Sequence, residues 1–492
     1  MARPRLPRSA LLVAVLLVSA SAGASPAGAH PASPHWSIVS ESEPTYFRAA
    51  GTSNAYVLIV RNDGAASTAP ASPVTISDRL PKGVTATKVK ANSEGPNSVG
   101  SPGDELSCLD PPGAEAVTCS YEESAEHGPL LAGETIVVTI AVVLPEGTAA
   151  LNENSATVSG GGAASASTTE TTQVEQEPAP FGLALFGVED VDESGERATQ
   201  AGSHPFEMST DIGLTVAARE LPSSQNGGAE RALAIAAPRD IELALPPGVV
   251  GDPHTVPQCS QRAFLEGENL SCPVDTQVGT IRPFFYGAFP PADYPVFNLV
   301  PPSSVPAELG FSVARVGRET IFFHLRVNER GEYGLAASLK GIPETGPLQG
   351  AILTLWGVPS EASHDLEREG TVGEGGQQNS EFCKPSVKVE AGVEIQTTCP
   401  SDAPAKPFLT LPSRCASNQP FTITTDSWES PGQFQSFASS QLETTGCEQL
   451  AFTPSLTLAP QTTQANTPSG YTIELHVPQN EDPTGLAEAD LR

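Results

Sequence analysis

The sequence predicts an all-β protein made of tandem immunoglobulin-like or Greek-key β-sandwich domains with little helix. Short apolar runs rich in valine and threonine alternate with turn residues, which is typical of this class. The 492 residues include 47 prolines and 44 glycines, a share below that of wholly disordered chains. Two further observations bear on this prediction: the chain has eight cysteines, and one turn motif recurs in it.

The recurring phrase is Leu-Pro-x-Gly at the end of an apolar run. It occurs at Leu80–Gly83, Leu144–Gly147 and Leu245–Gly248. Proline cannot donate a hydrogen bond to a sheet, and a glycine two residues later can adopt the positive φ of a tight turn. Each copy therefore predicts the end of a strand.

The first 29 residues predict a secretory signal peptide. Arg3, Arg5 and Arg8 precede an apolar run, Ala10–Val18, that is too short to anchor in a membrane, and small-residue cleavage sites follow, the later at Ala27–Ala29. No later run approaches the roughly 18 apolar residues of a membrane-spanning helix. We therefore expect a secreted protein, extracellular or at the cell surface, with no transmembrane segment in the mature chain.

The charge of the chain limits its partners. It has 57 acidic and 26 basic residues, a formal net charge of −31. Such a field repels phosphate backbones and anionic lipids, which argues against nucleic acid or membrane surfaces. The acidic residues are spread along the chain, which indicates a solvated acidic exterior. The partners we expect are a cell-wall component, a surface protein or a glycan.

Residues 36–170 predict the first sandwich domain. Apolar or alternating runs are separated by turn residues such as those of Arg61–Gly64, and this spacing is typical of a Greek-key sandwich. The strands that we expect are Tyr56–Val60, Val74–Ser77, Glu134–Leu144 and Asn154–Ser159.

These segments together resemble a bacterial surface repeat known as domain of unknown function eleven. The resemblance implies an immunoglobulin-like sandwich on exported cell-surface proteins, and it brings no catalytic residues. The loop that holds Cys108 and Cys119 is an insertion relative to the repeat. The motifs that carry the resemblance are Tyr56–Val60 with Asn62 and Gly64, Thr75–Gly83, Gly133–Ile140 and Asn154–Val158.

A linker and a larger unit follow. Gly160–Thr172 and Gln176–Pro180 have linker composition, and we place the linker at residues 171–180 because the last threonines can finish an edge strand. Residues 181–450 predict a larger disulfide-bearing β unit, possibly two sandwiches, with one short helix at Ser260–Leu265 capped by Ser260. Its expected strands are Leu183–Val188, Ile212–Ala218, Ile241–Leu245, Phe311–Val316, Thr320–Val327, Gly334–Leu339, Ala351–Trp356 and Phe421–Thr425.

Several phrases in this unit are similar to large uncharacterised secreted β-rich proteins of high-GC Gram-positive bacteria. They are Tyr294–Pro302, Trp356–Pro359 and Pro407–Pro412, and the similarity implies export and no known reaction. Residues 451–492 predict the start of a further β domain, with Tyr471–Val477 as its clearest strand. We expect this last domain to be truncated.

The eight cysteines predict disulfides, because their number is even and the chain is exported. Zinc is disfavoured because no Cys-x-x-Cys occurs. Pairing of neighbours in sequence is the economical choice among 105 connectivities, and for the last four, Cys399–Cys415 with Cys383–Cys447 stays open. The residues are Cys108, Cys119, Cys259, Cys272, Cys383, Cys399, Cys415 and Cys447.

A calcium loop is the one cofactor site that the sequence suggests. Asp190, Asp192, Ser194 and Gly195 match positions 1, 3, 5 and 6 of such a loop, but Ala201 stands where the bidentate acid should be. The alternative is an acidic hairpin turn, which we favour.

Catalytic residues do not assemble in the sequence. Ser363, His364 and Asp365 are neighbours, whereas a triad converges from separate segments, and no Gly-x-Ser-x-Gly occurs. His324 lies in a phenylalanine-rich strand and is expected to be half-buried.

The aromatic residues suggest one further site. Trp36, Trp356, Trp428 and Phe284–Tyr286 could stack on a sugar, although core packing explains most of them. The sequence thus predicts a non-catalytic exported structural or adhesive protein. A carbohydrate-binding module is the alternative, and a secreted hydrolase is a distant one.

Overall fold

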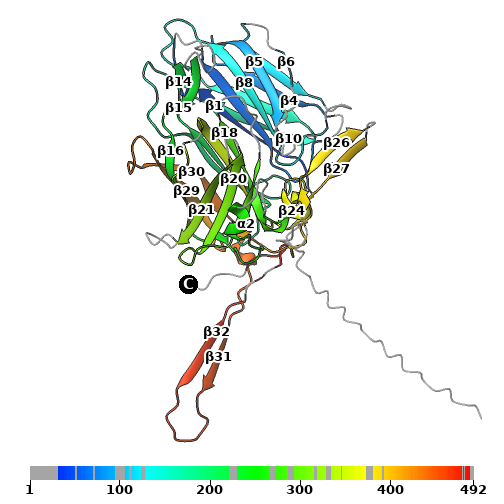
Figure 1. Cartoon of the computed structure of the whole chain (residues 1–492), viewed down its shortest axis with the longest axis vertical. Helices are drawn as coiled ribbons and strands as arrows, with labels where there is room; N and C mark the ends of the chain where they lie inside the picture. The colour runs from blue at the N-terminus through cyan, green and yellow to red at the C-terminus, as the bar shows by residue number, and fades with distance from the viewer. Residues whose placement is uncertain are drawn as a thin grey trace, which may run out of the picture.

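The structure is a computed structural model. It describes residues 32–49, 53–69, 72–94, 106–109, 113–122, 128–220, 230–265, 272–285, 293–314, 318–327, 334–344, 346–372, 381–390, 393–478, 480 and 482–487. The predicted signal peptide, residues 1–29, lies outside them. Three parts follow one another in space: a sandwich, a large curled sheet and a projecting hairpin (Figure 1). The predicted all-β class is confirmed, and α2 is the single α-helix of the described residues.

The first sandwich contains two antiparallel sheets. One has the order β1 (Trp36–Glu43), β3 (Ala55–Asn62), β8 (Thr135–Val143) and β5 (Thr85–Glu94). The other has the order β10 (Ala163–Glu170), β9 (Asn154–Gly160), β4 (Val74–Arg79), β7 (Ala116–Tyr121) and β6 (Ser107–Leu109).

Alternating side chains build the core between these sheets. Leu58 of β3, Ile140 of β8 and Val158 of β9 are fully buried, and their neighbours in sequence point the other way because side chains alternate along a strand. Each such side chain stabilises the fold by about 1.5–3 kcal/mol. Trp36 lies at one end of this core and donates its Nε1–H to the Gly160 carbonyl at 2.9 Å.

The expected linker begins later than its composition suggests. Gly160, Gly161 and Gly162 have φ of 93°, 67° and 86° and form the turn between β9 and β10. The following serines and threonines form strand β10, because alternating small polar residues suit an exposed edge. Even within 171–180, β11 (Gln173–Val174) pairs in parallel with β2 (Tyr46–Phe47).

The larger unit is built around one eleven-stranded sheet, and its possible division into two sandwiches stays a prediction. The sheet curls until its first and last strands approach: a Cβ at Gly182 would lie 2.8 Å from Phe437 Cζ. Its order is β12 (Leu183–Val191), β13 (Glu207–Leu214), β23 (Leu348–Trp356), β18 (Gln277–Phe285), β19 (Tyr294–Leu299), β20 (Ala307–Ala314), β21 (Arg318–Val327), β22 (Leu335–Lys340), β16 (Pro238–Ala244), β29 (Ala416–Ser427) and β30 (Gln435–Thr444).

Small elements lie outside the large sheet. The predicted helix is α2 (Gln261–Leu265), and its cap is confirmed because Ser260 Oγ accepts a hydrogen bond from the Ala263 amide at 3.1 Å. The others are the pairs β14 (Val216–Glu220) with β15 (Glu230–Ala234), β17 (Val250–Gly251) with β28 (Leu409–Thr410), β24 (Gly370–Val372) with β25 (Glu381–Cys383) and β26 (Ser386–Glu390) with β27 (Val393–Thr397), and the 3₁₀ turns η1 (Val274–Thr276), η2 (Ala362–His364) and η3 (Cys447–Gln449).

The three Leu-Pro-x-Gly turns occur as predicted, directly after β4, β8 and β16. Gly83, Gly147 and Gly248 have φ of 84°, 75° and 99°. In each turn, the residue after the glycine donates its amide hydrogen to the proline carbonyl, at 2.9 to 3.3 Å. The same turn chemistry thus ends strands in both units.

The last part is a two-stranded hairpin of β31 (Ser455–Pro460) and β32 (Tyr471–His476), which extends away from the body (Figure 1). The predicted strand Tyr471–Val477 corresponds to β32, and a further β domain in residues 451–492 stays a prediction. Among the described residues, no helix combines the length and the apolar character needed to cross a membrane.

Candidate functional site

The disulfides join neighbours in sequence throughout. The bonds are Cys108–Cys119, Cys259–Cys272, Cys383–Cys399 and Cys415–Cys447. The economical pairing is confirmed and the crossed alternative for the last four is wrong. Each bond closes a local loop of 11 to 32 residues.

The predicted calcium residues form a turn. Asp192 Oδ1 accepts hydrogen bonds from the amide and the hydroxyl of Ser194, at 2.8 and 2.6 Å. Asp190 is buried in β12, and burial raises the pKa of its carboxyl to about 7. In the part of the chain that the structure describes, no group of three or more His, Cys, Asp or Glu side chains is placed to hold a metal ion. Calcium binding at this turn stays a prediction.

The residues considered for a hydrolase do not form a triad. His364 is buried between the rings of Phe206 and Trp356, with centroids 4.6 and 4.4 Å away. Neither of its ring nitrogens has a hydrogen-bond partner among the described residues, and burial holds the pKa of the ring well below its usual value. Asp365 is instead paired with Arg368. A base that cannot reach a nucleophile or an orienting acid cannot act as one.

His324 has an acidic partner but no nucleophile. Its Nε2 lies 3.0 Å from Glu308 Oε2, and its side chain is 45% exposed rather than deeply buried. Ser338 lies directly opposite His324 in the sheet, but its hydroxyl donates to the His324 backbone carbonyl at 3.3 Å. The pair is thus explained as a cross-strand contact on the surface of the sheet.

The tryptophans do not form a sugar platform. Trp36 and Trp356 are buried in different units, and Trp428 is 40% exposed. The Arg239 guanidinium lies 5.4 Å from the centre of the Trp428 ring and covers one face. Tyr286 lies outside the described residues.

Charged residues meet where the first sandwich packs on the large sheet. We call this interface the seam: Arg61, Asp63 and Gly133 of the first sandwich with Glu207 and Glu367 of the second unit. Arg61 Nη2 lies 3.0 Å from Glu207 Oε1, and its Nη1 lies 3.2 Å from Asp63 Oδ1. The four charged side chains are nearly or fully buried. Buried charges are tolerated only when they are paired.

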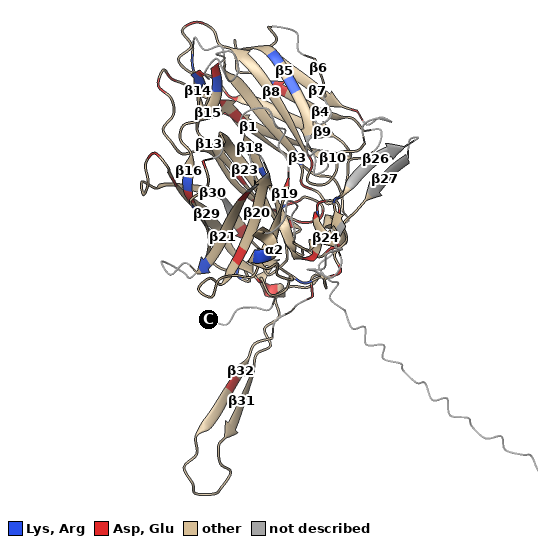
Figure 2. Ribbon diagram, viewed as in Figure 1, with Lys and Arg blue, Asp and Glu red and all other residues tan. Residues whose placement is uncertain are grey.

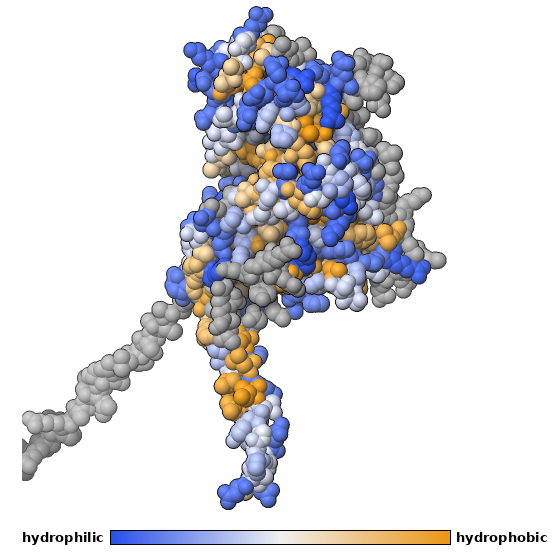
Figure 3. Space-filling view, turned by 90° about the vertical axis from the view of Figure 1, so that its left-hand side faces the viewer, coloured by the Kyte–Doolittle hydropathy of each residue, from blue (hydrophilic) through white to orange (hydrophobic). Residues whose placement is uncertain are grey.

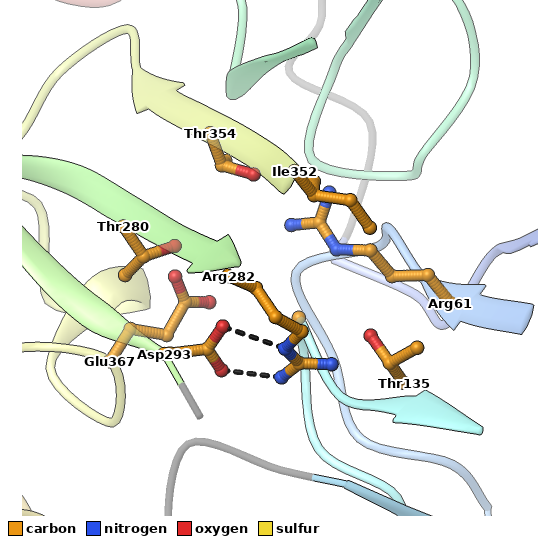
Figure 4. A pocket seen from close by; sticks show the side chains of 9 residues that line it. Arg61, Thr135, Thr280, Arg282, Asp293, Ile352, Thr354 and Glu367 are labelled. Carbon is orange, nitrogen blue, oxygen red and sulfur yellow. Dashed lines mark hydrogen bonds and ion pairs between the residues drawn. The ribbon is translucent and has the colours of Figure 1, made fainter. Parts of the chain in front are cut away.

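A small cavity of about 10 Å³ lies beside Arg61 (Figure 4). In the wall of this cavity, Arg282 forms a bidentate ion pair with Asp293, with nitrogen–oxygen distances of 2.9 and 2.5 Å. Glu367 Oε2 accepts a hydrogen bond from Trp356 Nε1 at 3.1 Å. The cavity has room for about one water molecule, so it is too small for an organic substrate. Its wall also includes Gly133, Thr135, Thr280, Ile352 and Thr354.

Backbone and side-chain hydrogen bonds extend the seam at the end of β1, toward β14 and β23. The Thr45 amide donates to the Val216 carbonyl at 3.0 Å, and the Val216 amide donates to Thr45 Oγ1 at 2.8 Å. Gln349 Nε2 donates to Glu43 Oε1 at 3.0 Å. The two units are therefore joined by directional contacts over several strands.

The hairpin has the opposite character. In its register, Leu456 faces Leu475 and Leu458 faces Ile473, so these residues share one face, together with Tyr471. They are 52–63% exposed, and Figure 3 shows apolar surface on the part of the projecting element that lies nearest the body. The two strands pair only with each other in the described residues, so the outer edge of each keeps free backbone groups.

The other face of the hairpin is polar. Thr457 lies opposite Glu474, and Ala459 lies opposite Thr472. Glu474 is the only residue of Ser455–His476 that is charged at neutral pH, whereas charged residues are scattered over the body (Figure 2). The hairpin is therefore an amphipathic, nearly neutral element on a strongly acidic protein.

Sequence reasoning found the strand Tyr471–Val477 but not its exposure. The alternation of Leu456 with Leu458, and of Tyr471 with Ile473 and Leu475, predicts a strand with one apolar face. Such a pattern normally means that the apolar face is buried, and nothing local in the sequence shows whether a covering layer is present.

No protein-family model matches the chain, and no curated protein matches it. Similar solved structures include the C-terminal domain of the Streptococcus agalactiae AgI/II polypeptide BspA, at 8% identity over 83% of this chain and 99% of that chain, with a TM-score of 0.18. Another is the partial N-terminal region of enterococcal surface protein, at 10% identity, 86% and 98% coverage and a TM-score of 0.22.

A third is AvmM, described as catalysing macrocyclization in alchivemycin A biosynthesis. It shows 10% identity, covers 30% of this chain and 92% of its own, and has a TM-score of 0.20. At these scores, none of the three likenesses bears on what this chain does.

Proposed function

We propose that the chain is a non-catalytic, exported structural or adhesive protein of the cell surface, and that the hairpin β31–β32 is its contact element. The observation that carries the proposal is the apolar face of the hairpin. Isolated two-stranded hairpins are marginally stable in water, and contiguous exposed apolar surface marks interaction sites. The hairpin therefore gains stability when a partner covers it.

The chemistry of the hairpin favours a protein partner with a β-sheet edge or an apolar groove. Free strand edges supply backbone hydrogen bonds for strand addition, and alternate side chains enter pockets. A glycan would need many side-chain hydrogen bonds, but the apolar face offers only the Tyr471 hydroxyl besides carbon. Low charge on the hairpin lets it approach a partner that the acidic body would repel.

The rest of the protein forms a stable body that carries the hairpin. Four disulfides suit an oxidising compartment outside the cell, which agrees with the signal peptide that the first 29 residues predict. The seam joins the two units, so that the hairpin is presented by one body.

The test is the binding of protein-coated beads to cells of the source organism. We expect binding to fall at least tenfold in the double variant Leu458→Asn with Ile473→Asn, and to be lost when protease removes surface proteins from the cells. Glycosidase treatment should leave it unchanged. The matched control is Thr457→Asn with Thr472→Asn, on the polar face of the same hairpin. The proposal would be contradicted if binding remained after protease treatment of the cells, or if the double variant Leu458→Asn with Ile473→Asn bound as well as the wild type.

A further inference from the structure

More buried carboxyl groups than cations meet at the seam. Arg61 and Asp63 come from the end of β3 and its turn, Glu207 comes from β13, and Glu367 follows η2. Glu367 reaches the first sandwich directly: a Cβ at Gly133 would lie 3.2 Å from its Oε1. That oxygen has no hydrogen-bond partner among the described residues.

Two further arginines near these carboxyls each have an acidic partner, although Nη1 of Arg282 has no hydrogen-bond partner among the described residues. Arg282 of β18 holds Asp293, and Arg368 holds Asp365. Arg61 is paired with Asp63 and Glu207, and it also attracts the carboxylate of Glu367, on which Arg368 acts more weakly. The remaining acids that face this group are Asp211 of β13 and Glu189 of β12, and Glu189 also faces Arg197 and His35.

A second group of acids lies along the same interface. Glu41 of β1 touches the backbone of β13, since a Cβ at Gly213 would lie 2.1 Å from Glu41 Oε1. The charged groups around Glu41 are Glu43, Glu170 and Asp211, all acidic. Closing the seam thus presses acids of the first sandwich against acids of the second unit.

We propose that the seam is a proton-controlled latch: it is closed while some of these carboxyls carry protons, and it loosens as they ionise. Ionisation leaves several negative charges in a poorly hydrated interface that holds fewer arginines than carboxylates. Separation of the two units hydrates the carboxylates and relieves their repulsion. Residues 175–182, which connect β11 to β12, would change conformation on opening.

The direction of the pH response follows from linkage. Burial raises the pKa of Glu207 to about 8 and that of Glu367 to about 7, and it raises the pKa of Glu41 to about 8. Opening returns each carboxyl toward its ordinary value of 4.5, so the closed form binds more protons. The closed seam is therefore most stable below about pH 4.5 and weakens until about pH 8. Each proton released on opening makes opening about tenfold more favourable per pH unit.

The first test uses small-angle scattering of the full mature, oxidised protein between pH 4.5 and 8.5. We expect the radius of gyration to rise with pH, and Glu367→Gln with Glu41→Gln to flatten this rise. Glutamine keeps an acceptor for Trp356 Nε1 but cannot ionise. The matched control is Glu115→Gln with Glu153→Gln, which removes two exposed charges of the first sandwich away from the seam. A radius that does not change with pH in the wild type, or a rise that the seam variant retains in full, would overturn the latch.

A second measurement needs no variant. The amides of Thr45 and Val216 take part in hydrogen bonds across the seam. After correction for the intrinsic effect of pH on exchange, we expect their hydrogen-exchange protection to fall at least tenfold between pH 5 and 8. Constant protection of both amides over this range would overturn the latch. Bead binding by the hairpin is a separate readout, so the two proposals can fail independently.

Discussion

The seam and the hairpin invert the usual division of polar and apolar groups. At the seam, the side chain of Arg61 is 9% exposed and that of Glu207 is 2% exposed. On the hairpin, Leu458 is 57% exposed and Ile473 is 63% exposed. Soluble proteins ordinarily bury the second kind of residue and expose the first.

The difference teaches what each region is built to do. Buried charges need particular partners, so they fix how the two units meet and make that contact sensitive to protonation. Exposed apolar residues need no particular partner geometry until something covers them. The seam is therefore suited to an internal joint, and the hairpin is suited to an external contact.

Loss of the seam cation should have the largest effect on stability. Arg61→Met leaves the carboxyls of Asp63 and Glu207 buried without their partner. We expect the free energy of unfolding at pH 7 to fall by about 3–5 kcal/mol, as measured by urea denaturation.

The matched control is Arg48→Met, whose ion pair with Glu230 is partly exposed and should contribute no more than about 1 kcal/mol. Equal losses in the two variants would show that burial does not distinguish the seam from an ordinary surface pair.

Removal of a buried polar group that lacks a hydrogen-bond partner should have the opposite effect on stability. His364→Phe removes two unpaired ring nitrogens and keeps an aromatic ring between Phe206 and Trp356. We expect stability at pH 7 to stay equal or to rise by about 1 kcal/mol. The folded pKa of His364 is lowered, so the native histidine destabilises the protein as pH falls below 6.5.

The variant should therefore lose less stability than the wild type between pH 6.5 and 5. Thermal unfolding across this range measures it, with exposed His254→Phe as the control. If the thermal stability of the wild type and that of His364→Phe depended on pH in the same way, the assignment of a buried neutral ring would be contradicted.

The smallest effect on stability is expected at the hairpin. Leu458→Asn with Ile473→Asn changes side chains that are already exposed, so the free energy of unfolding of the body should change by no more than about 0.5 kcal/mol. A large loss would mean that the hairpin packs on the body in solution, which would remove the contrast with the seam.

Local chemistry made part of this molecule predictable. Leu-Pro-x-Gly predicted three strand ends with positive-φ glycines, and short cysteine spacing predicted the disulfides. Composition misled at Gly160–Thr172, because glycine and threonine suit both linkers and exposed hairpins. For residues 181–450, the sequence did not decide between one and two sandwiches. The large sheet of this unit depends on long-range pairing, such as that of Ile241 with Leu339 and with Thr425.

The seam could not be predicted for the same reason. Arg61–Gly64 has the composition of a turn, and nothing near it indicates that Arg61 pairs with Glu207, 146 positions later in the chain. Burial of a charge depends on which surfaces meet, and local patterns do not contain that information. The hairpin shows the converse, since its pattern predicted a strand but not the absence of a cover.

Amide hydrogen exchange of the hairpin, compared between the free protein and the protein bound to cells, tests the central claim most directly. In the free protein, the amides of β31 and β32 should exchange rapidly, because the hairpin is exposed on both faces. On binding, we predict slower exchange in Leu456–Leu458 and Tyr471–Leu475. Unchanged exchange in both strands, with protection appearing on the body instead, would contradict the claim that the hairpin is the contact element.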